Sequence, residues 1–445
     1  MDRMTGRKRL VKMIVYGCQM NFAEAERMEG QLREIGFEAT EDAEKADLIL
    51  MHTCCVRETA EDKAYGKIGE IKRLKRERPS LILGVTGCMA QKESDALIRR
   101  APHIDFVLGT GRIGELSRVV EELLAERVPH VVDVAEDGAL PEEGTPARQG
   151  TVSAWVPIMY GCDNFCTYCI VPYVRGRERS RRPEDILCEI EDAAAKEFRE
   201  ITLLGQNVNS YGKDHKLADF AELLQMADRV EGIERVRFMT SHPKDLSERL
   251  IAAVRDGKHI CEHFHLPIQH GSDRILKAMN RNYTTEKYRE LVRAIRENVP
   301  NASLTTDLIV GFPGETEADF EELLGFLREI RYDAAYTFLY SPRSGTPAAK
   351  LEGQVPDEVK HERLERLMEL QNQISLERNQ KLDGTVQEVL IEGPSRTDEA
   401  IWTGRTRTGK IVLWPHQDGE KVGALAQIRI TQPQTWVLKG ERTEG

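Results

Sequence analysis

Long hydrophobic runs are missing from this chain of 445 residues. No stretch approaches the roughly 18 to 20 apolar residues that a helix needs to cross a bilayer, which argues against a membrane span. The basic start at Arg7 to Arg9 is followed by an apolar run from Met13 to Tyr16, which is too short for the core of a signal peptide. We therefore expect a cytoplasmic protein.

An excess of positive charge is missing as well. The formal net charge is -11, so the molecule as a whole is not attracted to nucleic acid or to an anionic membrane. Any contact with RNA must come from local basic patches. The nine cysteines are an odd number in a large chain, which argues against a disulfide framework and for metal-binding or catalytic thiols in a reducing compartment. The length allows two or three domains with sizeable cores.

Three cysteines lie close together at Cys162, Cys166 and Cys169, and no fourth ligand is near them in the sequence. A structural zinc site needs four ligands, and the next candidates, Cys188 and His263, are some way off. The C-x-x-C pair within the triplet also fits a thiol redox motif, although the third thiol disfavours that interpretation. An iron-sulfur cluster on three thiolates leaves one iron open for a small molecule, which suits catalysis.

Short β-rich runs alternate with amphipathic stretches in the first part of the chain. The expected strands are 11–17, 46–53, 81–87, 106–110 and 130–134, and the expected helices are 22–35, 57–78, 91–100 and 113–125. This alternation predicts a mostly parallel, doubly wound sheet with helices on both faces. Cys18, Cys54 and Cys88 follow the carboxyl ends of three strands, the edge at which such sheets bind ligands. The three thiols can therefore converge, unless each is a buried structural cysteine.

The middle of the chain begins after a stretch that predicts a linker. Residues 135–150 are rich in acidic residues, glycine and proline and have no hydrophobic period. This places a first domain at 1–134 and a second at 151–382. In the second, six β-α units, with strands starting at 155, 200, 235, 263, 302 and 334, predict a partial TIM-like barrel whose active face is the carboxyl end of the strands. Polar residues gather there, either as loop or cap residues or as a site: Gln206, Asn207, Ser241, His242, Gln269, His270, Ser341 and Arg343.

The last part of the chain, 383–445, follows a charged helical stretch at 357–381. Its alternating apolar and polar residues between glycine and proline breaks predict a small antiparallel β-barrel of the oligonucleotide-binding kind. Eight Lys or Arg balance eight Asp or Glu from 384 to 445, so composition alone does not show RNA binding. Trp402, Trp414 and Trp436 either stack on bases or fill the core.

Several motifs together resemble one family over nearly the whole chain. The spacing of CDNFCTYC is that of radical S-adenosylmethionine (SAM) enzymes, and YGCQMN, HTCCVRE and TGCMAQ resemble the three cysteine motifs of the methylthiotransferases. Further motifs similar to that family are VRGRERSR, LLGQNVNSYG, TSHP, LPIQHGSDRIL, TDLIVGFPGET and SPRSGTPAA, and the last domain resembles its TRAM domain. Gln19 to Asn21 and the segment VRETAEDKAYGKIG resemble the MiaB branch. The sequence departs from the family at His52, where asparagine is usual, and at Cys55, which adjoins the family cysteine Cys54.

The resemblance implies an enzyme that adds a methylthio group to C2 of isopentenyladenosine next to the tRNA anticodon. It implies two 4Fe-4S clusters and two SAM molecules per product. One cluster is expected on Cys162, Cys166 and Cys169, with SAM on its open iron, and the auxiliary cluster on Cys18, Cys54 and Cys88. The expected partners are tRNA carrying isopentenyladenosine and a low-potential flavodoxin or ferredoxin, and we expect a monomer.

Further contacts are weaker predictions. The expected SAM contacts are Gln206, Asn207, Ser241, Gln269 and Arg343. The expected RNA contacts are Arg175, Arg177, Arg179, Arg181 and Arg182, and the basic run 72–78 is either another RNA contact or a solvated helix face. Cys188 and Cys261 are expected to be buried and inert.

Two other functions stay open. The same chemistry could act on threonylcarbamoyladenosine in tRNA or on an aspartate of a ribosomal protein, as in the RimO branch. The chain could also be a non-catalytic RNA-binding protein with a structural metal.

Overall fold

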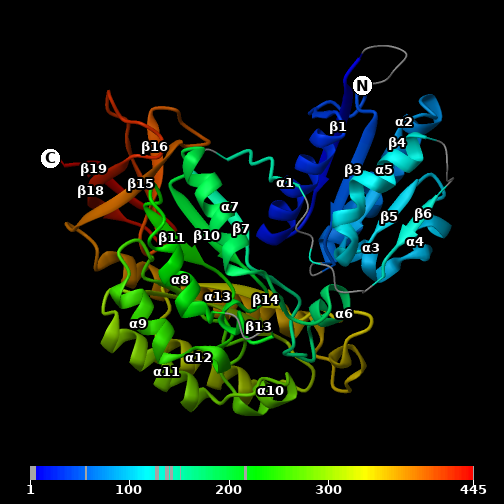
Figure 1. Cartoon of the computed structure of the whole chain (residues 1–445). Coiled ribbons are helices and arrows are strands. Elements are labelled where there is room, and N and C mark those ends of the chain that lie inside the picture. Colours follow the sequence, from blue (N-terminus) through cyan, green and yellow to red (C-terminus); the bar gives the residue numbers. More distant parts are fainter. Residues whose placement is uncertain are drawn as a thin grey trace. The chain divides into compact units, whose positions relative to one another are not determined.

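The computed structural model describes residues 7–55, 58–125, 130–135, 140, 144–150, 152–214 and 218–443 (Figure 1). The chain divides into two compact units. The first comprises residues 1–149 with 160–163 and 169–179, and the second comprises 150–159, 164–168 and 180–445. Of the predicted linker, residues 136–139 and 141–143 lie outside the described residues. Residues 56 and 57, which begin the segment VRETAEDKAYGKIG, also lie outside them, and the second of these is the first residue of the expected helix at 57–78.

The first unit is built on a parallel six-stranded sheet with the order β2-β1-β3-β4-β5-β6. Its strands are β1 (Arg9–Val15), β2 (Phe37–Ala39), β3 (Leu48–Thr53), β4 (Ile82–Gly87), β5 (Phe106–Leu108) and β6 (Val131–Asp133). The five expected strands are confirmed. Sequence analysis missed β2, because it has three residues and exposes two of them, so it shows no hydrophobic pattern.

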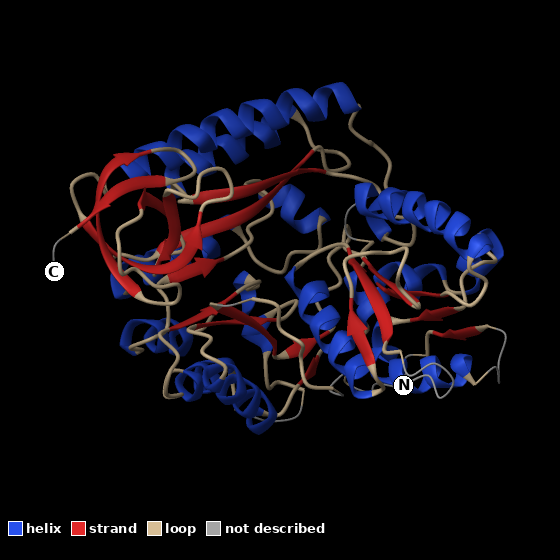
Figure 2. Cartoon of the chain, turned by 90° about the horizontal axis from the view of Figure 1, so that it is seen from above, coloured by secondary structure: helices blue, strands red, loops and turns tan. Residues whose placement is uncertain are grey.

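Helices cover both faces of this sheet (Figure 2). They are α1 (Gln19–Glu34), α2 (Glu58–Glu77), α3 (Cys88–Glu93), α4 (Asp95–Arg100) and α5 (Leu116–Leu124), with a 3₁₀ turn η1 (Thr110–Glu115). The expected helix at 91–100 is wrong in its bounds: it begins at Cys88 and is broken at Ser94, whose φ is 50°. Alternate residues of β3 enter two cores, Ile49 and Met51 on one face and Leu48 and Leu50 on the other. This burial on both sides confirms the doubly wound arrangement.

The second unit contains six parallel strands in two three-stranded sheets, β11-β10-β7 and β12-β13-β14. A parallel bridge pairs Val236 of β11 with Ile260, three residues before β12, and the sequential order of the strands confirms the predicted partial barrel. The strands are β7 (Ser153–Pro157), β10 (Glu200–Leu204), β11 (Arg235–Phe238), β12 (His263–His265), β13 (Ser303–Val310) and β14 (Ala334–Leu339). The short elements β8 (Met159–Tyr160), α6 (Val171–Arg175) and β9 (Arg179–Ser180) lie along the cysteine segment.

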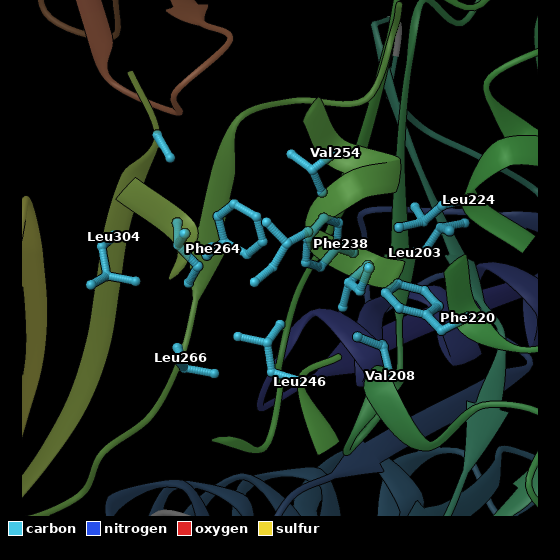
Figure 3. Close-up of a cluster of buried hydrophobic side chains, with 14 of the residues drawn as sticks. Leu203, Val208, Phe220, Leu224, Phe238, Leu246, Val254, Phe264, Leu266 and Leu304 are labelled. Carbon is cyan, nitrogen blue, oxygen red and sulfur yellow. The ribbon is translucent and has the colours of Figure 1, made fainter. Parts of the chain in front are cut away.

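Helices of the second unit alternate with its strands along the chain. They are α7 (Pro183–Ala195), α8 (Phe220–Ala227), α9 (Glu248–Asp256), α10 (Asp273–Ala278), α11 (Thr285–Asn298), α12 (Glu317–Ile330) and α13 (Asp357–Gln380), with 3₁₀ turns η2 (Val208–Ser210), η3 (Pro243–Asp245) and η4 (Pro347–Lys350). Two of them, α10 and α11, lie between β12 and β13. Phe238 lies at the centre of the core between strands and helices (Figure 3). Its ring packs edge-to-face on Phe220 at 5.4 Å and on Phe264 at 6.0 Å between centroids. This dry core fixes the ends of the strands that carry the polar residues.

The C-terminal segment closes into the predicted small barrel, with strand order β15-β16-β17-β19-β18. Its neighbouring strands pair antiparallel as predicted, except β17 and β19, which pair in parallel. Its strands are β15 (Val386–Pro394), β16 (Ile401–Thr406), β17 (Ile411–Pro415), β18 (Leu425–Pro433) and β19 (Leu438–Arg442). Trp414 fills its core, and Trp402 stacks on His416 with 4.2 Å between ring centroids. Trp436 is 63% exposed. Trp414 therefore fills the core, as one alternative has it, whereas the stacking of a tryptophan on bases stays a prediction.

Buried arginines attach this small barrel to the strands of the second unit. Arg237 donates to the carbonyl oxygens of Thr406 and Arg407 at 2.7 and 2.8 Å, and Arg235 donates to the carbonyl oxygen of Glu388 at 3.1 Å. Arg407 in turn forms an ion pair with Glu262 at 2.8 Å. The guanidinium groups of Arg235 and Arg237 thus bind carbonyl oxygens of the barrel backbone. Within the described residues, no helix is long and apolar enough to cross a membrane.

Candidate functional site

Three cysteines of the first unit lie at the carboxyl edge of neighbouring strands. Cys18 caps the start of α1 directly after β1, Cys54 follows β3, and Cys88 opens α3 after β4. Two glycines allow these turns to approach one another. A Cβ on Gly17 would lie 2.7 Å from the Cβ of Cys54, and a Cβ on Gly87 would lie 2.4 Å from the carbonyl oxygen of Thr53. Both glycines have positive φ, 128° and 93°, which side-chain-bearing residues rarely adopt.

Cys55 packs against Cys88, and both are buried. A hydrogen bond from the Cys55 thiol lowers the pKa of Cys88 to about 6, although burial opposes this shift. The same hydrogen bond, together with burial, raises the pKa of Cys55. The lowered pKa favours the thiolate form of Cys88, which is the form of cysteine that binds metals. The choice of Cys54 rather than Cys55 as the third candidate ligand stays a prediction.

Behind these cysteines lies a buried ion pair that sequence analysis did not predict. The guanidinium of Arg175, at the end of α6, donates to both carboxylate oxygens of Glu24 on α1 at 2.6 and 2.9 Å. Arg175 also donates to Oδ1 of Asn21 at 3.2 Å, and the same oxygen accepts from the thiol of Cys18 at 3.3 Å. His52 Nε2 lies 2.9 Å from the Glu24 carboxylate. The cysteine-bearing edge is thus connected to the segment that follows Cys169.

The charges of this network are compensated. Burial by itself raises the pKa of Glu24, but the charge of Arg175 and hydrogen bonds from His52 and Arg175 outweigh it and lower that pKa to about 2. Glu24 is therefore ionised at neutral pH. His52, the departure from the family's usual asparagine, is buried and also lies 2.8 Å from the hydroxyl of Thr86. It connects α1 to the ends of β3 and β4.

The second cysteine triplet runs along the segment between β8 and α6. Cys162 and Cys169 are half-buried and belong to the first unit, and Cys166 is buried and belongs to the second. The backbone N–H of Cys162 donates to the carbonyl oxygen of Gly176 at 3.1 Å. Arg281 Nη1 donates to Sγ of Cys166 at 3.3 Å.

A tight ion site is not found in the part of the chain that the structure describes. There, no group of three or more His, Cys, Asp or Glu side chains is placed to hold one metal ion. This leaves a 4Fe-4S cluster open, because each thiolate of such a cluster binds a different iron.

The polar residues predicted at the strand ends of the second unit divide into two groups. Asn207 uses its side chain within the fold, since its amide donates to Asp245 at 2.8 Å and its oxygen accepts from the His242 N–H at 3.0 Å. In contrast, the buried atoms Oε1 of Gln206 and Oγ of Ser241 find no hydrogen-bond partner among the described residues. Buried polar atoms without partners are costly. A polar ligand such as SAM would satisfy them.

Two other predicted SAM contacts also follow strands of this unit. Gln269 lies after β12 with a φ of 72°, and its backbone pairs with β13 through Asp307 and Ile309. Arg343 lies after β14, where its carbonyl oxygen accepts from the N–H of Thr346. The assignment of these residues to SAM stays a prediction.

The arginines predicted to contact RNA differ in exposure. Arg175 is buried in the ion pair with Glu24, and Arg181 is buried against Glu189 at 2.8 Å. Arg179 is half-buried, Arg182 is exposed, and the side chain of Arg177 is 73% exposed. Exposure therefore favours Arg177 and Arg182 as RNA contacts. The RNA assignment of all five stays a prediction.

Two remaining thiols lie apart from the triplets in sequence. Cys261 is buried, and burial raises its pKa, as expected for an inert thiol. Cys188 is exposed on α7, so the expectation that it is buried is wrong. Cys188 lies on the solvent-exposed face of this helix, and the periodicity of the sequence did not distinguish this position from a buried one.

Comparison with solved structures supports the fold. The radical SAM methyltransferase TsrM from Kitasatospora setae, with cobalamin and a 4Fe-4S cluster bound, matches with a TM-score of 0.58 at 15% identity, over 86% of this chain and 81% of that chain. The cobalamin-dependent radical SAM enzyme OxsB matches with a TM-score of 0.53 at 13% identity, over 82% of this chain and 56% of that chain. At such low identities the likeness concerns the fold alone.

Family models and curated relatives cover the chain almost completely. The model of the Radical SAM superfamily matches residues 156–327, that of the Uncharacterized protein family UPF0004 matches 10–109, and that of the TRAM domain matches 380–442. The tRNA-2-methylthio-N(6)-dimethylallyladenosine synthase of Desulforamulus reducens is 53% identical, over 99% of this chain and 97% of the relative. The enzyme of the same name from Moorella thermoacetica is 49% identical, over 98% of this chain and 99% of the relative. This protein therefore belongs to the radical SAM enzyme family of the tRNA-2-methylthio-N(6)-dimethylallyladenosine synthases.

Proposed function

We propose that this protein catalyses the radical SAM-dependent methylthiolation of C2 of N6-isopentenyladenosine next to the anticodon of tRNA. The observation that carries the proposal is a match of 53% identity over 99% of this chain to a relative of that name, combined with two separate sets of three cysteines. We further propose two 4Fe-4S clusters, two SAM molecules per product, a flavodoxin or ferredoxin as electron donor and a monomeric enzyme. The proposed domains are 1–134, 151–382 and 383–445, joined by the linker 135–150.

The residues of the first triplet suit an auxiliary cluster. Cys18, Cys54 and Cys88 come from the ends of adjacent strands, and the lowered pKa of Cys88 favours the thiolate that iron requires. Cys18 also lies at the start of α1, where the helix dipole favours a negative sulfur. These properties support the proposal that the three thiols hold the cluster associated with the transferred sulfur.

The second triplet suits the cluster that binds SAM. Cys162, Cys166 and Cys169 supply three thiolates, and the unpartnered atoms of Gln206 and Ser241 offer polar contacts for a ligand at the strand ends. When bound, the clusters and SAM supply one-electron chemistry, because an adenine C2 hydrogen is far too weak an acid for removal by a side-chain base. The protein's own residues hold, orient and shield these groups.

The RNA must present its base from a single-stranded loop. Proteins that read RNA sequence usually bind such loops by stacking and by hydrogen bonds to base edges. The exposed side chains of Arg177 and Arg182 are suited to phosphate contacts, and Trp436 offers an exposed ring for stacking.

Nucleoside analysis of tRNA from a strain without the gene tests the proposal. We expect the methylthiolated isopentenyl nucleoside to disappear and to return with the wild-type gene. It should not return with the Cys166→Ala variant, whereas Cys188→Ala, at an exposed thiol outside both triplets, should restore it. Persistence of this nucleoside in the deletion strain would refute the proposed substrate.

Two further measurements separate the alternatives. Loss of the methylthiolated threonylcarbamoyl nucleoside, or of methylthioaspartate in a ribosomal protein, would reassign the substrate within the same chemistry. Iron and sulfide analysis after anaerobic purification addresses the non-catalytic alternative. Zinc without labile sulfide would favour an RNA-binding protein with a structural metal.

A further inference from the structure

A buried arginine touches one thiol of the second triplet. Arg281 lies three residues after the end of α10, and its Nη1 donates to Sγ of Cys166 at 3.3 Å. Arg281 is 7% exposed and Cys166 is 6% exposed, so little water screens the contact. Both residues belong to the second unit.

The rest of the guanidinium is fixed by neutral groups. Nη2 of Arg281 donates to the carbonyl oxygen of Pro267 at 2.8 Å, and Nε donates to the hydroxyl of Tyr283 at 2.7 Å. That hydroxyl donates in turn to the carbonyl oxygen of Ile268 at 2.9 Å. No carboxylate is among the hydrogen-bond partners that the described residues provide for Arg281. The Cys166 sulfur is therefore the group that a buried positive charge is placed to compensate.

The residues just before Arg281 clamp the cysteine loop. The side chain of Asn280, whose φ is 58°, donates to the carbonyl oxygen of Phe165 at 3.0 Å. Thr167 donates through its N–H to Met279 at 3.0 Å and through its hydroxyl to Ala278 at 2.9 Å. The residues on either side of Cys166 are thus hydrogen-bonded to the segment that precedes Arg281.

We propose that Arg281 is a positioning residue that raises the reduction potential of the cluster bound through Cys166. This inference rests on the proposed function, which makes Cys166 a cluster ligand. Reduction adds one negative charge to the cluster, and a fixed positive charge at the ligand sulfur stabilises that reduced state. Hydrogen bonds to cluster sulfurs, net charge and solvent exposure are the properties that set such potentials. The low local dielectric of a buried contact strengthens the effect.

Redox titration followed by electron paramagnetic resonance tests the inference. The parent is the full-length chain in which Cys18, Cys54 and Cys88 are replaced by alanine, so that one cluster contributes to the signal. We expect Arg281→Gln in this parent to retain iron and sulfide and to lower the reduction equilibrium constant at least threefold, which is about 30 mV for one electron. Arg274→Gln is the matched control, because this arginine lies on α10 and its side chain is 56% exposed.

A second variant keeps the inference testable if Arg281→Gln loses its cluster. The ammonium of Arg281→Lys lacks the planar fork that reaches Pro267, Tyr283 and Cys166 together, so the charge is no longer held at the sulfur. We expect its potential to lie between those of the parent and the glutamine variant. If a variant that retains its cluster has the same reduction potential as the parent, the inference is wrong, and the proposed function is unaffected. A parent without iron and sulfide overturns the proposed function and the inference with it.

Discussion

Replacing Glu24 by glutamine is expected to destabilise the first unit by about 3 to 5 kcal/mol, the usual cost of breaking a buried ion pair. The carboxylate faces a guanidinium that is 5% exposed in its side chain and that has two hydrogen bonds to it. Lowering the pKa of Glu24 from 4.5 to about 2 corresponds to roughly 3 kcal/mol of stabilisation of the ionised form. The usual cost of breaking a buried ion pair and the lowered pKa of Glu24 therefore give a similar magnitude for the stabilisation.

The dependence on pH has a definite sign. Because the folded pKa of Glu24 lies below its ordinary value of 4.5, the stabilisation is fully present above pH 4.5 and is lost as the pH falls toward about 2. The glutamine variant has no carboxylate to protonate. The difference in stability between wild type and variant should consequently shrink across that range.

Hydrogen exchange read by mass spectrometry on peptides of α1 is the suitable assay, because a chain of two units need not unfold in one step. Arg118→Ala serves as the control, since its exposed pairs with Glu115 and Glu122 are worth below about 1 kcal/mol. The double variant Glu24→Gln with Arg175→Gln should lose less stability than the two single variants added together. The double variant leaves no unpaired charge of this ion pair buried, whereas each single variant leaves one. A Glu24→Gln effect as small as that of the control would refute the reasoning.

Three further changes have expected outcomes. Phe238→Ala, in the core of the partial barrel, should cost about 3 to 5 kcal/mol in exchange protection of β10 and β11, and a loss below about 1 kcal/mol would contradict the packing. Trp436→Ala should leave stability unchanged but weaken tRNA binding by about 1 to 3 kcal/mol, measured by fluorescence anisotropy; unchanged affinity would exclude stacking. Arg407→Ala should speed proteolysis between α13 and β15, and wild-type cleavage would show that the pair with Glu262 does not hold the barrel.

Local patterns were enough to predict the order of the elements. Short, continuous β-rich runs marked β3 and β4, and an amphipathic stretch marked α1, because these signals depend only on residues close together in the chain. The same holds for the two cysteine triplets, since spacing and the position after a strand are visible in the sequence. Local patterns did not predict the three-residue strand β2, which is defined by its pairing with β1. They also did not predict the helix break at Ser94, which is defined by the backbone conformation of that residue.

The sequence by itself determined which thiols are available and on which strand ends they lie. Tertiary structure alone decided which charges surround them. Arg281 is 115 residues away from Cys166, and Arg175 is 151 residues away from Glu24. No short-range sequence pattern can therefore predict either contact. In a sequence, an arginine that will be buried cannot be distinguished from one on the surface, because only the folded structure determines its exposure to water. For the same reason Trp414 and Trp436 could not be told apart, although the closed barrel buries one and leaves the other 63% exposed.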